Sequence, residues 1–306
     1  MLRVATYNIH RGRGSDGRLD LARTADLVLS LNADLIALQE VETPALMAAR
    51  AFLERVSAAG YQPLLGPTIR NERHDYGNVL LSRLPLLDCE RVDLSVPGRE
   101  PRGLLDARFG PLPDGIAEPA GEGARRQPLP MLRCLATHLG LRRSERHRQV
   151  ARIVAQLKTA RLRPRGAEAH ELGLDADIEP SPAACSETPI LLLGDFNEWH
   201  LSSRLRPLAR RMVSAPARSS WHAWWPLLAL DRIWYRGLSL RSTWVLRGGS
   251  ARWASDHLPL VADFVAPAPP RRSAVTDRSL EQGVAADRQM LFRKLDAIVW
   301  TSCVGR

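Results

Sequence analysis

The sequence of 306 residues predicts an α/β fold in which β-sheets pack face to face and helices lie outside them. Many short segments show the apolar alternation or the short apolar runs that are typical of strands. Several longer segments carry apolar residues at helical spacing. In several places neighbouring strands have no helix between them, and this pattern favours stacked sheets over a purely parallel sheet.

Strands and two helices are expected in the first half of the chain. Residues 4–9 alternate as a strand does, and a helix follows from Leu21 with Asp20 as its cap. The apolar face of that helix is formed by Leu21, Ala25, Val28 and Leu31. A second helix runs from about residue 45 and ends at Gly60, a residue type that favours helix ends. The other strands expected here cover residues 34–40, 79–82, 86–94, 104–109 and 131–137.

The second half begins with an amphipathic helix over residues 144–162, and another helix is expected near residues 201–212. Strands are expected over residues 190–193, 230–235, 239–246 and 258–264. Residues 110–130 and 163–189 lack periodicity and are expected to be loops. The Pro-rich segment 266–272 is interpreted as a linker. We therefore expect one domain over residues 1–265 and a linker with a C-terminal tail over residues 266–306, where a helical pattern covers residues 287–299.

Composition excludes some classes of protein. No apolar run approaches the ~18 residues that a membrane span needs. The N-terminus enters a strand pattern and lacks the apolar core of a signal peptide, so a cytoplasmic location is expected. The four cysteines form no Cys-x-x-Cys pair, which argues against a zinc site or a redox motif. Cys134 falls in an apolar strand and is expected in the core.

The net charge of +10 favours anionic partners such as nucleic acid, phosphorylated small molecules or an anionic membrane surface. Almost all of the positive charge comes from arginine, and the only lysines are Lys158 and Lys294. Coding by a GC-rich genome explains the same excess, so the charge alone does not indicate a dedicated basic patch.

Polar groups suited to catalysis stand at the ends of expected strands. The run from Leu191 to Leu193 is followed by Gly194, Asp195, Phe196 and Asn197. Residues i and i+2 of an extended segment point the same way, so Asp195 and Asn197 aim at one point past the strand end. The carboxylate can orient or deprotonate a water, and the amide can donate to a phosphate oxygen. Other such residues are Asn8, Glu40, His138, Asp231, Asp256 and His257.

Each of these residues also has an ordinary structural explanation. Asn8 and Asp256 can close turns. Glu40 can be a solvated carboxylate, His138 a core histidine and Asp231 the partner of a neighbouring arginine. For most of them, considered alone, the ordinary explanation is preferred. Their number and their order along the chain change that balance.

Seven segments together resemble the endonuclease/exonuclease/phosphatase superfamily of DNase I-like metal-dependent phosphohydrolases, and the opening residues 10–20 look like those of an uncharacterised bacterial subgroup of it. They occur in the family's order and span residues 1–265. The segments are Thr6–His10, Leu38–Val41, Tyr76–Ser82, Thr137–Leu139, Gly194–Asn197, Leu230–Ile233 and Ser255–Leu260. The resemblance implies a four-layer α/β sandwich with two mixed β-sheets and helices outside. It also implies hydrolysis of a phosphate ester with Mg²⁺ or Mn²⁺ as the cofactor.

The resemblance further implies metal and substrate roles for the matching residues. Asn8 and Glu40 hold or orient the metal, and Asp256 lies beside it. A site with one or two carboxylate ligands suits Mg²⁺, because this ion keeps several waters and also binds the substrate phosphate. Such a site does not suit zinc. Tyr76 and Arg102 stand where some relatives contact the phosphate.

The catalytic roles follow from the same resemblance. Asp195 activates or positions the water, and Asn197 supports the phosphate. His257 contacts the scissile phosphate, Asp231 orients His257, and His138 supplies a second imidazole. A carboxylate behind His257 fixes its tautomer and favours its protonated form.

These features favour a metal-dependent phosphodiesterase of the nuclease type. One alternative is a hydrolase of phospholipid or sphingomyelin head groups or of inositol phosphates. An alternative of another class is a catalytically silent binding protein on the same fold. Residues 221–226 contain three tryptophans and are the best candidate for substrate contact, although core packing also explains them. The Arg- and Gly-rich residues 10–20 form either an anion-binding loop or a solvated turn, and Trp234 is expected in the core.

Overall fold

The structure is a computed structural model that describes residues 1–43, 47–70, 75–110, 131–159, 188–199 and 203–265. These residues lie in the first of two units, Met1–Pro267 and Ala268–Arg306. The expected tail and most of both expected loops lie outside the described residues, so the predicted domain boundary stays a prediction.

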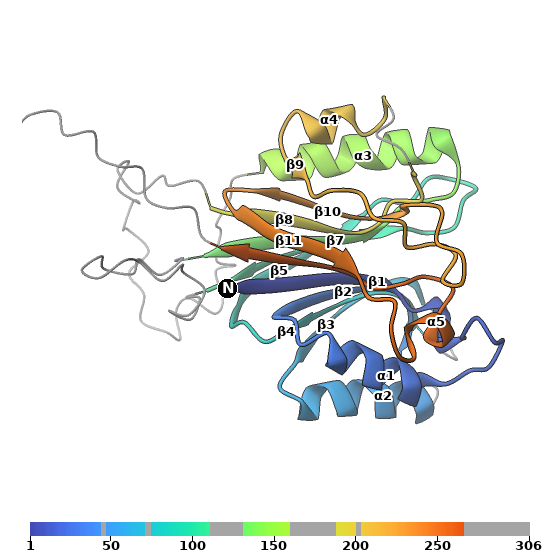
Figure 1. Ribbon diagram of the computed structural model, residues 1–306. Coiled ribbons are helices and arrows are strands. Elements are labelled where there is room, and N and C mark those ends of the chain that lie inside the picture. The colour runs from blue at the N-terminus through green and yellow to red at the C-terminus, as the bar shows by residue number, and fades with distance from the viewer. Residues whose placement is uncertain (44–46, 71–74, 111–130, 160–187, 200–202, 266–306) are drawn as a thin grey trace, which may run out of the picture. The chain divides into compact units, whose positions relative to one another are not determined.

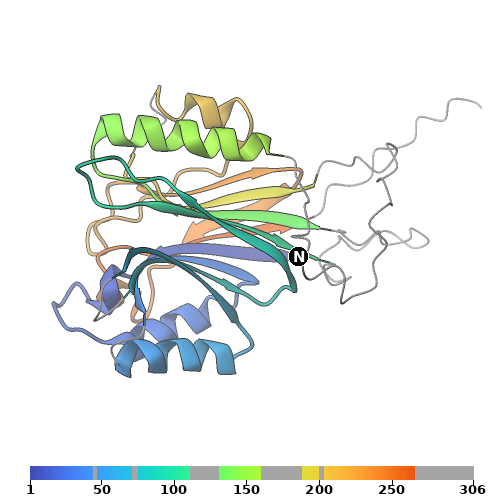
Figure 2. The same cartoon turned by 180° about the vertical axis from the view of Figure 1, so that it is seen from behind.

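Two six-stranded mixed sheets pack face to face and carry helices on their outer surfaces (Figure 1). The helices α1 (Leu21–Ser30) and α2 (Met47–Ala58) cover one sheet, and α3 (Arg143–Lys158) and α4 (Arg206–Ala209) cover the other. The view from behind shows the same four layers (Figure 2). The predicted four-layer sandwich is confirmed. None of the described helices has the length and apolar character to cross a membrane.

The first sheet has the order β11-β12-β1-β2-β4-β3, and the second has the order β5-β6-β7-β8-β10-β9. The first sheet's strands are β1 (Leu2–Asn8), β2 (Leu35–Thr43), β3 (Gln62–Arg70), β4 (Asp75–Ser82), β11 (Ser239–Val245) and β12 (Leu260–Val265). The second sheet's strands are β5 (Leu86–Asp93), β6 (Gly103–Phe109), β7 (Leu132–His138), β8 (Ile190–Asp195), β9 (Val213–Ser214) and β10 (Asp231–Arg236). Each sheet holds one parallel pair, β1 with β2 and β7 with β8.

Alternation along the strands divides the core into three layers, because successive side chains of a strand point to opposite faces. Leu191 and Leu193 of β8 belong to the apolar cluster between the sheets. Ile190 and Leu192 belong to the cluster under α3 and α4. Cys134 and Trp234 are fully buried, as expected. Both sheets therefore carry apolar side chains on both faces.

Two expectations about secondary structure were incomplete. The sequence pattern did not predict β3, whose Pro63, Gly66 and Pro67 weaken a strand signal. β3 lies at the edge of its sheet, where missing backbone donors are tolerated. The helix expected near residues 201–212 is limited to α4, and Val213–Ser214 instead pair with β10 as β9.

Candidate active site

The carboxyl ends of the two parallel pairs meet at one edge of the sandwich. β1 ends at Asn8, and β7 and β8 end at His138 and Asp195, which are paired in register. The antiparallel β10 begins at Asp231, which pairs with Asp195. The segment that precedes β12 brings His257 to the same edge, where Asp231 binds it. Strand direction therefore collects Asn8, His138, Asp195 and Asp231 from both sheets, and the segment before β12 adds His257.

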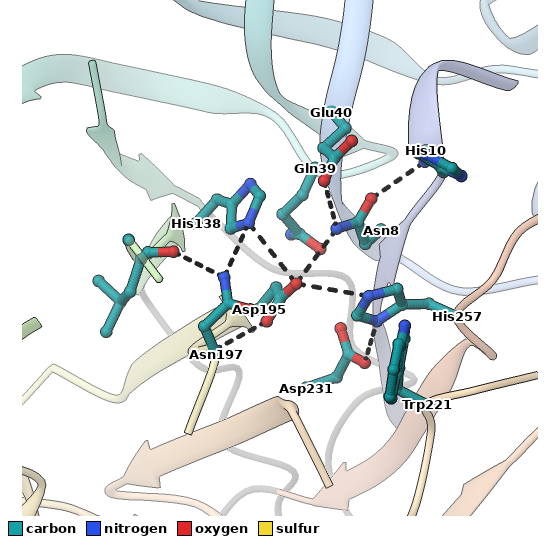
Figure 3. Close-up of polar contacts among 12 residues, drawn as sticks. Asn8, His10, Gln39, Glu40, His138, Asp195, Asn197, Trp221, Asp231 and His257 are labelled. Atoms are coloured by element: carbon teal, nitrogen blue, oxygen red, sulfur yellow. Dashed lines mark hydrogen bonds and ion pairs between the residues drawn. The ribbon is translucent and has the colours of Figure 1, made fainter. Parts of the chain in front are cut away.

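Asp195 is the centre of the polar network (Figure 3). Its Oδ1 accepts a hydrogen bond from the backbone N–H of Asn197 at 2.8 Å, and its Oδ2 accepts from Asn8 Nδ2 at 3.1 Å. The same Oδ2 lies 3.6 Å from His138 Nε2 and 3.7 Å from His257 Nε2. The carboxylate is 1% exposed, so an amide and two imidazoles replace most of its solvent. Gly194 is required beside it, because a Cβ there would lie 2.1 Å from the carbonyl oxygen of Thr137.

An irregularity in β2 directs Glu40 into the site. The register between β2 and β4 shifts between Leu38 and Val41, and Glu40 has a φ of 57°. Such bulges commonly redirect a side chain near an active site. Asn8 Nδ2 donates to Glu40 Oε1 at 3.0 Å as well as to Asp195. One amide group thus holds two carboxylates close together.

His257 and Asp231 form a buried pair. His257 Nδ1 lies 2.9 Å from Asp231 Oδ2, and Ser220 Oγ donates to the same oxygen at 2.5 Å. Burial alone would lower the pKa of His257, but Asp231, Asp195 and Asp256 outweigh it and raise the pKa to about 10. Near neutral pH the ring is therefore an imidazolium whose Nε2–H faces Asp195.

His138 is held in the opposite state. Arg102 Nη1 lies 3.2 Å from His138 Nδ1, and a guanidinium can only donate, so Nδ1 accepts and the ring's proton is on Nε2. Burial, opposed by the attraction of Asp195 and aided by Arg102 and His257, lowers the pKa of His138 to about 3. Asn197 Nδ2 lies 3.2 Å from His138 Nε2 and donates to the carbonyl oxygen of Leu139 at 2.8 Å. Asp195 is thus flanked by one neutral and one charged histidine.

The opposite charge states of the two rings can be measured. In the metal-free protein we expect nitrogen NMR to show His257 doubly protonated from neutral pH to near its pKa of about 10. His138 should stay neutral down to near its pKa of about 3. Asp231→Asn removes the largest source of charge stabilisation and should bring the pKa of His257 down. A neutral His257 in the wild-type protein near neutral pH would contradict this assignment.

Asp256 is held by neighbours on several segments. Its Oδ2 accepts from Trp221 Nε1 at 3.1 Å, and its Oδ1 lies 3.5 Å from His10 Nδ1. Burial opposes ionisation, but His257 and His10 hold the pKa of Asp256 below its ordinary value. Since both oxygens of Asp256 have neighbours, Glu40 is the more accessible carboxylate for a metal.

These residues surround a pocket of about 710 Å³. Nine of the ten predicted site residues line it: Asn8, Glu40, Tyr76, Arg102, His138, Asp195, Asn197, Asp256 and His257. The tenth, Asp231, lies fully buried behind His257. Arg11 and Arg13 of the Arg- and Gly-rich segment also face the pocket, as does Trp221 of the tryptophan-rich segment. The geometry brings the whole predicted set together, whereas the roles of its members remain predictions.

The potential metal-ligand atoms of the pocket suit a hard divalent cation. Its lining includes the carboxylates of Glu40, Glu42, Glu100, Asp195 and Asp256, and no cysteine among the described residues. Oxygen donors of this kind are those that Mg²⁺ prefers. Asp195, Asp231 and His257 also offer ligand atoms within 4.8 Å of one another. A metal between those three would compete with the proton that joins His257 to Asp231, so Glu40 with Asn8 is the better fit.

The fold and the pocket define a phosphoesterase-like α/β sandwich, and comparison with known proteins agrees. The chain belongs to the Endonuclease/Exonuclease/phosphatase family, whose model matches residues 5–257. Members of this family hydrolyse phosphate esters and generally use divalent metal ions. The uncharacterized protein YbhP of Escherichia coli K12 is 29% identical over 286 residues, which cover 86% of this chain and 95% of YbhP.

Two solved structures share the fold at low sequence identity. The mannosyl-6-phosphatase Bt3783 of Bacteroides thetaiotaomicron is 15% identical with a TM-score of 0.60, and the match covers 87% of this chain and 100% of that one. D. rerio TDP2 complexed with a single-strand DNA product is 16% identical with a TM-score of 0.56, and the match covers 86% and 98%.

Several residues that complete the site were not predicted as part of it. Ser220 supports Asp231, Glu100 binds Arg102 at 3.1 Å, and His10 lies against Asp256. His10 carried a weak signal, because it lies two residues after Asn8 in a matching segment. Ser220 and Glu100 carried none, because both lie outside the expected strands and the matching segments.

Proposed function

We propose that the protein is a Mg²⁺- or Mn²⁺-dependent phosphodiesterase of the nuclease type. The proposal rests chiefly on one observation. The buried Asp195 carboxylate lies between the neutral His138 and the charged His257, at 3.6 and 3.7 Å. Neighbouring groups with pKa values pushed apart are typical of acid and base pairs in catalysis.

In this mechanism Asp195 orients the attacking water and accepts its proton as the water oxygen bonds to phosphorus and the leaving alkoxide departs. Negative charge builds on the phosphate oxygens. The His257 imidazolium and the Asn197 amide stabilise that charge, and such electrostatic help is typically the largest contribution to catalysis. Asp231 keeps His257 charged and oriented. His138 donates its Nε2–H toward the same region.

A divalent ion, when bound, supplies Lewis-acid stabilisation of the phosphate charge. Glu40 is the carboxylate proposed to hold it. Asn8 positions Glu40 and Asp195 through its two hydrogen bonds. Asp256 is proposed to act beside the ion, in an orientation set by Trp221.

Tyr76 and Arg102 are proposed substrate contacts. Tyr76 is 4% exposed, and burial and Glu40 raise its pKa, so its hydroxyl remains a neutral donor. Arg11 stacks over the Tyr76 ring at 4.7 Å. Together with Arg13 it places positive charge at the pocket, which supports the anion-binding interpretation of residues 10–20.

Hydrolysis of phospholipid or sphingomyelin head groups is the second candidate, because apolar side chains are exposed near the pocket. Leu141 lines the pocket and is 70% exposed. Trp225 and Leu227 are each 80% exposed, and they lie on the loop whose ends, Trp221 and Leu228, also line the pocket. Exposed tryptophan and leucine are suited to a lipid interface. Inositol phosphates and phosphate monoesters share the same chemistry at the scissile bond.

A panel of phosphate esters tests the proposal. We expect the full-length protein to hydrolyse bis-p-nitrophenyl phosphate with Mg²⁺ or Mn²⁺, and to lose that activity in EDTA, because the ion stabilises the developing charge. Plasmid nicking should exceed release of head groups from sphingomyelin or phospholipid vesicles.

The other outcomes separate the alternatives. Vesicle hydrolysis without plasmid nicking would favour the lipid enzyme. Turnover of p-nitrophenyl phosphate in place of the diester would favour a phosphomonoesterase. Tight metal binding by calorimetry with no hydrolysis of any ester would favour the catalytically silent binding protein. Diester hydrolysis that persists in EDTA would reject the metal-dependent mechanism.

A further inference from the structure

A second cavity lies next to the catalytic pocket, between β3 at the edge of the first sheet and strands β5 and β6 of the second. Its volume is about 320 Å³. Three arginines line it: Arg70 at the end of β3, Arg91 on β5 and Arg102 in the loop before β6. Asp93 is the one acidic residue among its described lining residues. Positive charge is therefore in excess around this cavity.

Arg102 connects the cavity with the catalytic pocket, because it lines both. The side chain is 6% exposed. Its Nη1 lies 3.2 Å from His138 Nδ1 and donates to Glu100 Oε1 at 3.1 Å. Its Nε is buried and has no hydrogen-bond acceptor among the described residues. A buried donor without an acceptor is costly, so this group indicates a ligand that brings an acceptor oxygen.

Two other charged residues of the cavity, Arg91 and Asp93, are held in place by hydrogen bonds to the backbone. Arg91 Nε donates to the carbonyl oxygen of Leu65 at 2.6 Å, which holds this side chain of β5 against β3. Asp93 Oδ1 accepts from the backbone N–H of Ser95 at 2.8 Å, so the acidic residue is engaged within its own turn. Glu100, which binds Arg102 through both Nη1 and Nη2, does not line the cavity, so the three arginines and Asp93 are the charged groups that face it among the described residues.

We propose that this cavity is a second phosphate-binding site. The planar donor groups of arginine match phosphate oxygens, and such charge-assisted hydrogen bonds are among the stronger ones in proteins. A small hollow lined by Tyr76, Arg102 and His138 among others shares lining residues with both cavities, and Arg102 lines all three. Arg102 therefore links the two sites. The phosphate comes either from a second phosphate group of the substrate, which rests on the proposed function, or from a free phosphate ion.

Binding is tested without turnover. Inorganic phosphate is titrated into the full-length, EDTA-treated protein while NMR follows the arginine Nε–H resonances. We expect the Arg102 signal to shift on binding. Arg70→Met and Arg91→Met should each weaken that binding roughly tenfold or more, as loss of a charge-assisted hydrogen bond predicts. Arg50→Met, which removes an exposed arginine of α2, should have no effect.

Two controls keep the binding test decisive. Asn197→Ala should leave this binding event in place, because Asn197 faces only the catalytic pocket. Unchanged unfolding midpoints of Arg70→Met and Arg91→Met would show that both variants fold. An Arg102 signal that ignores phosphate, or that responds equally in the wild type and in both cavity variants, would overturn the proposal.

Kinetics then distinguishes the source of the phosphate. If the substrate supplies it, Arg91→Met should raise KM roughly tenfold for terminally phosphorylated dithymidylate and leave bis-p-nitrophenyl phosphate unaffected. If a free ion supplies the phosphate, added phosphate should change the rate of bis-p-nitrophenyl phosphate hydrolysis in the wild type and not in Arg91→Met. In that case Arg91→Met should not raise KM selectively for terminally phosphorylated dithymidylate. Either result supports the site. Failure of the wild type to hydrolyse either ester would reject the proposed function alone, since the binding test does not depend on catalysis.

Discussion

Replacing Asp195 by asparagine is expected to lower turnover by roughly a hundredfold to a thousandfold, on the scale of losing one key electrostatic group of an active site. The substitution keeps the size of the side chain, and an amide oxygen can still accept from the backbone N–H of Asn197. At the position of Oδ2, however, an amide nitrogen would face Asn8 Nδ2 and both histidine Nε2 atoms. The variant loses both the proton acceptor and the charge around which the network is arranged.

The measurement is kcat on the ester that the wild-type protein hydrolyses best, with saturating metal. Asp263→Asn is the matched control. Asp263 is also a buried carboxylate, but it pairs with Arg3 at 2.8 Å and lies on β12 outside the pocket. The Asp263→Asn substitution should alter the stability of the protein and leave kcat near the wild-type value. If folded Asp195→Asn retained wild-type kcat, Asp195 would not be the residue that activates the water.

Strand and helix positions were largely predictable, because burial on both faces leaves a strong pattern. Val4 and Tyr7 of β1 face different clusters, and each is fully buried. The segment therefore had to be apolar on both sides. β3 escaped prediction, since an edge strand does not need every backbone donor and can include Pro63 and Pro67. Edge strands tolerate the residues that weaken the sequence signal.

The site was predictable only in part, and the reason is geometric. The period of a strand predicted that Asp195 and Asn197 share a direction. In the structure β8 ends at Asp195 and Asn197 has a φ of 48°, so a turn, not the strand, places the Asn197 side chain at the pocket. That Asp231 meets His257 follows from sheet order, which no local pattern contains, and the prediction depended on the resemblance to a family. The contact of Arg102 with His138 depends on a loop conformation and sets the charge state of that histidine. The protonated form of His257 was expected once the resemblance placed Asp231 behind it, whereas the neutral form of His138 depends on burial and on Arg102, which the sequence does not show.

Asp106→Ala is expected to lower the free energy of unfolding by about 3–5 kcal/mol, because it leaves a buried charge without its partner. Arg133 Nε donates to Asp106 Oδ1 at 2.8 Å, and Nη2 donates to Oδ2 at 2.5 Å. Asp106 is 0% exposed and Arg133 is 5% exposed. Arg133 also donates to the carbonyl oxygen of Gln156 at 2.8 Å, so the pair joins β6 and β7 to the last turn of α3. Urea unfolding measures the change.

Two comparisons separate this effect from a general loss of packing. Asp88→Ala removes a carboxylate that is 51% exposed and binds Arg108 at 2.9 Å, and its cost should stay within about 1 kcal/mol. Asp106→Leu combined with Arg133→Met removes both charges and should recover much of the loss, since the penalty arises from the unpaired guanidinium. If the single variant Asp106→Ala were as stable as Asp88→Ala, the buried pair would contribute no more than an exposed one. The helix-covered face of the second sheet would then owe its stability to apolar packing alone.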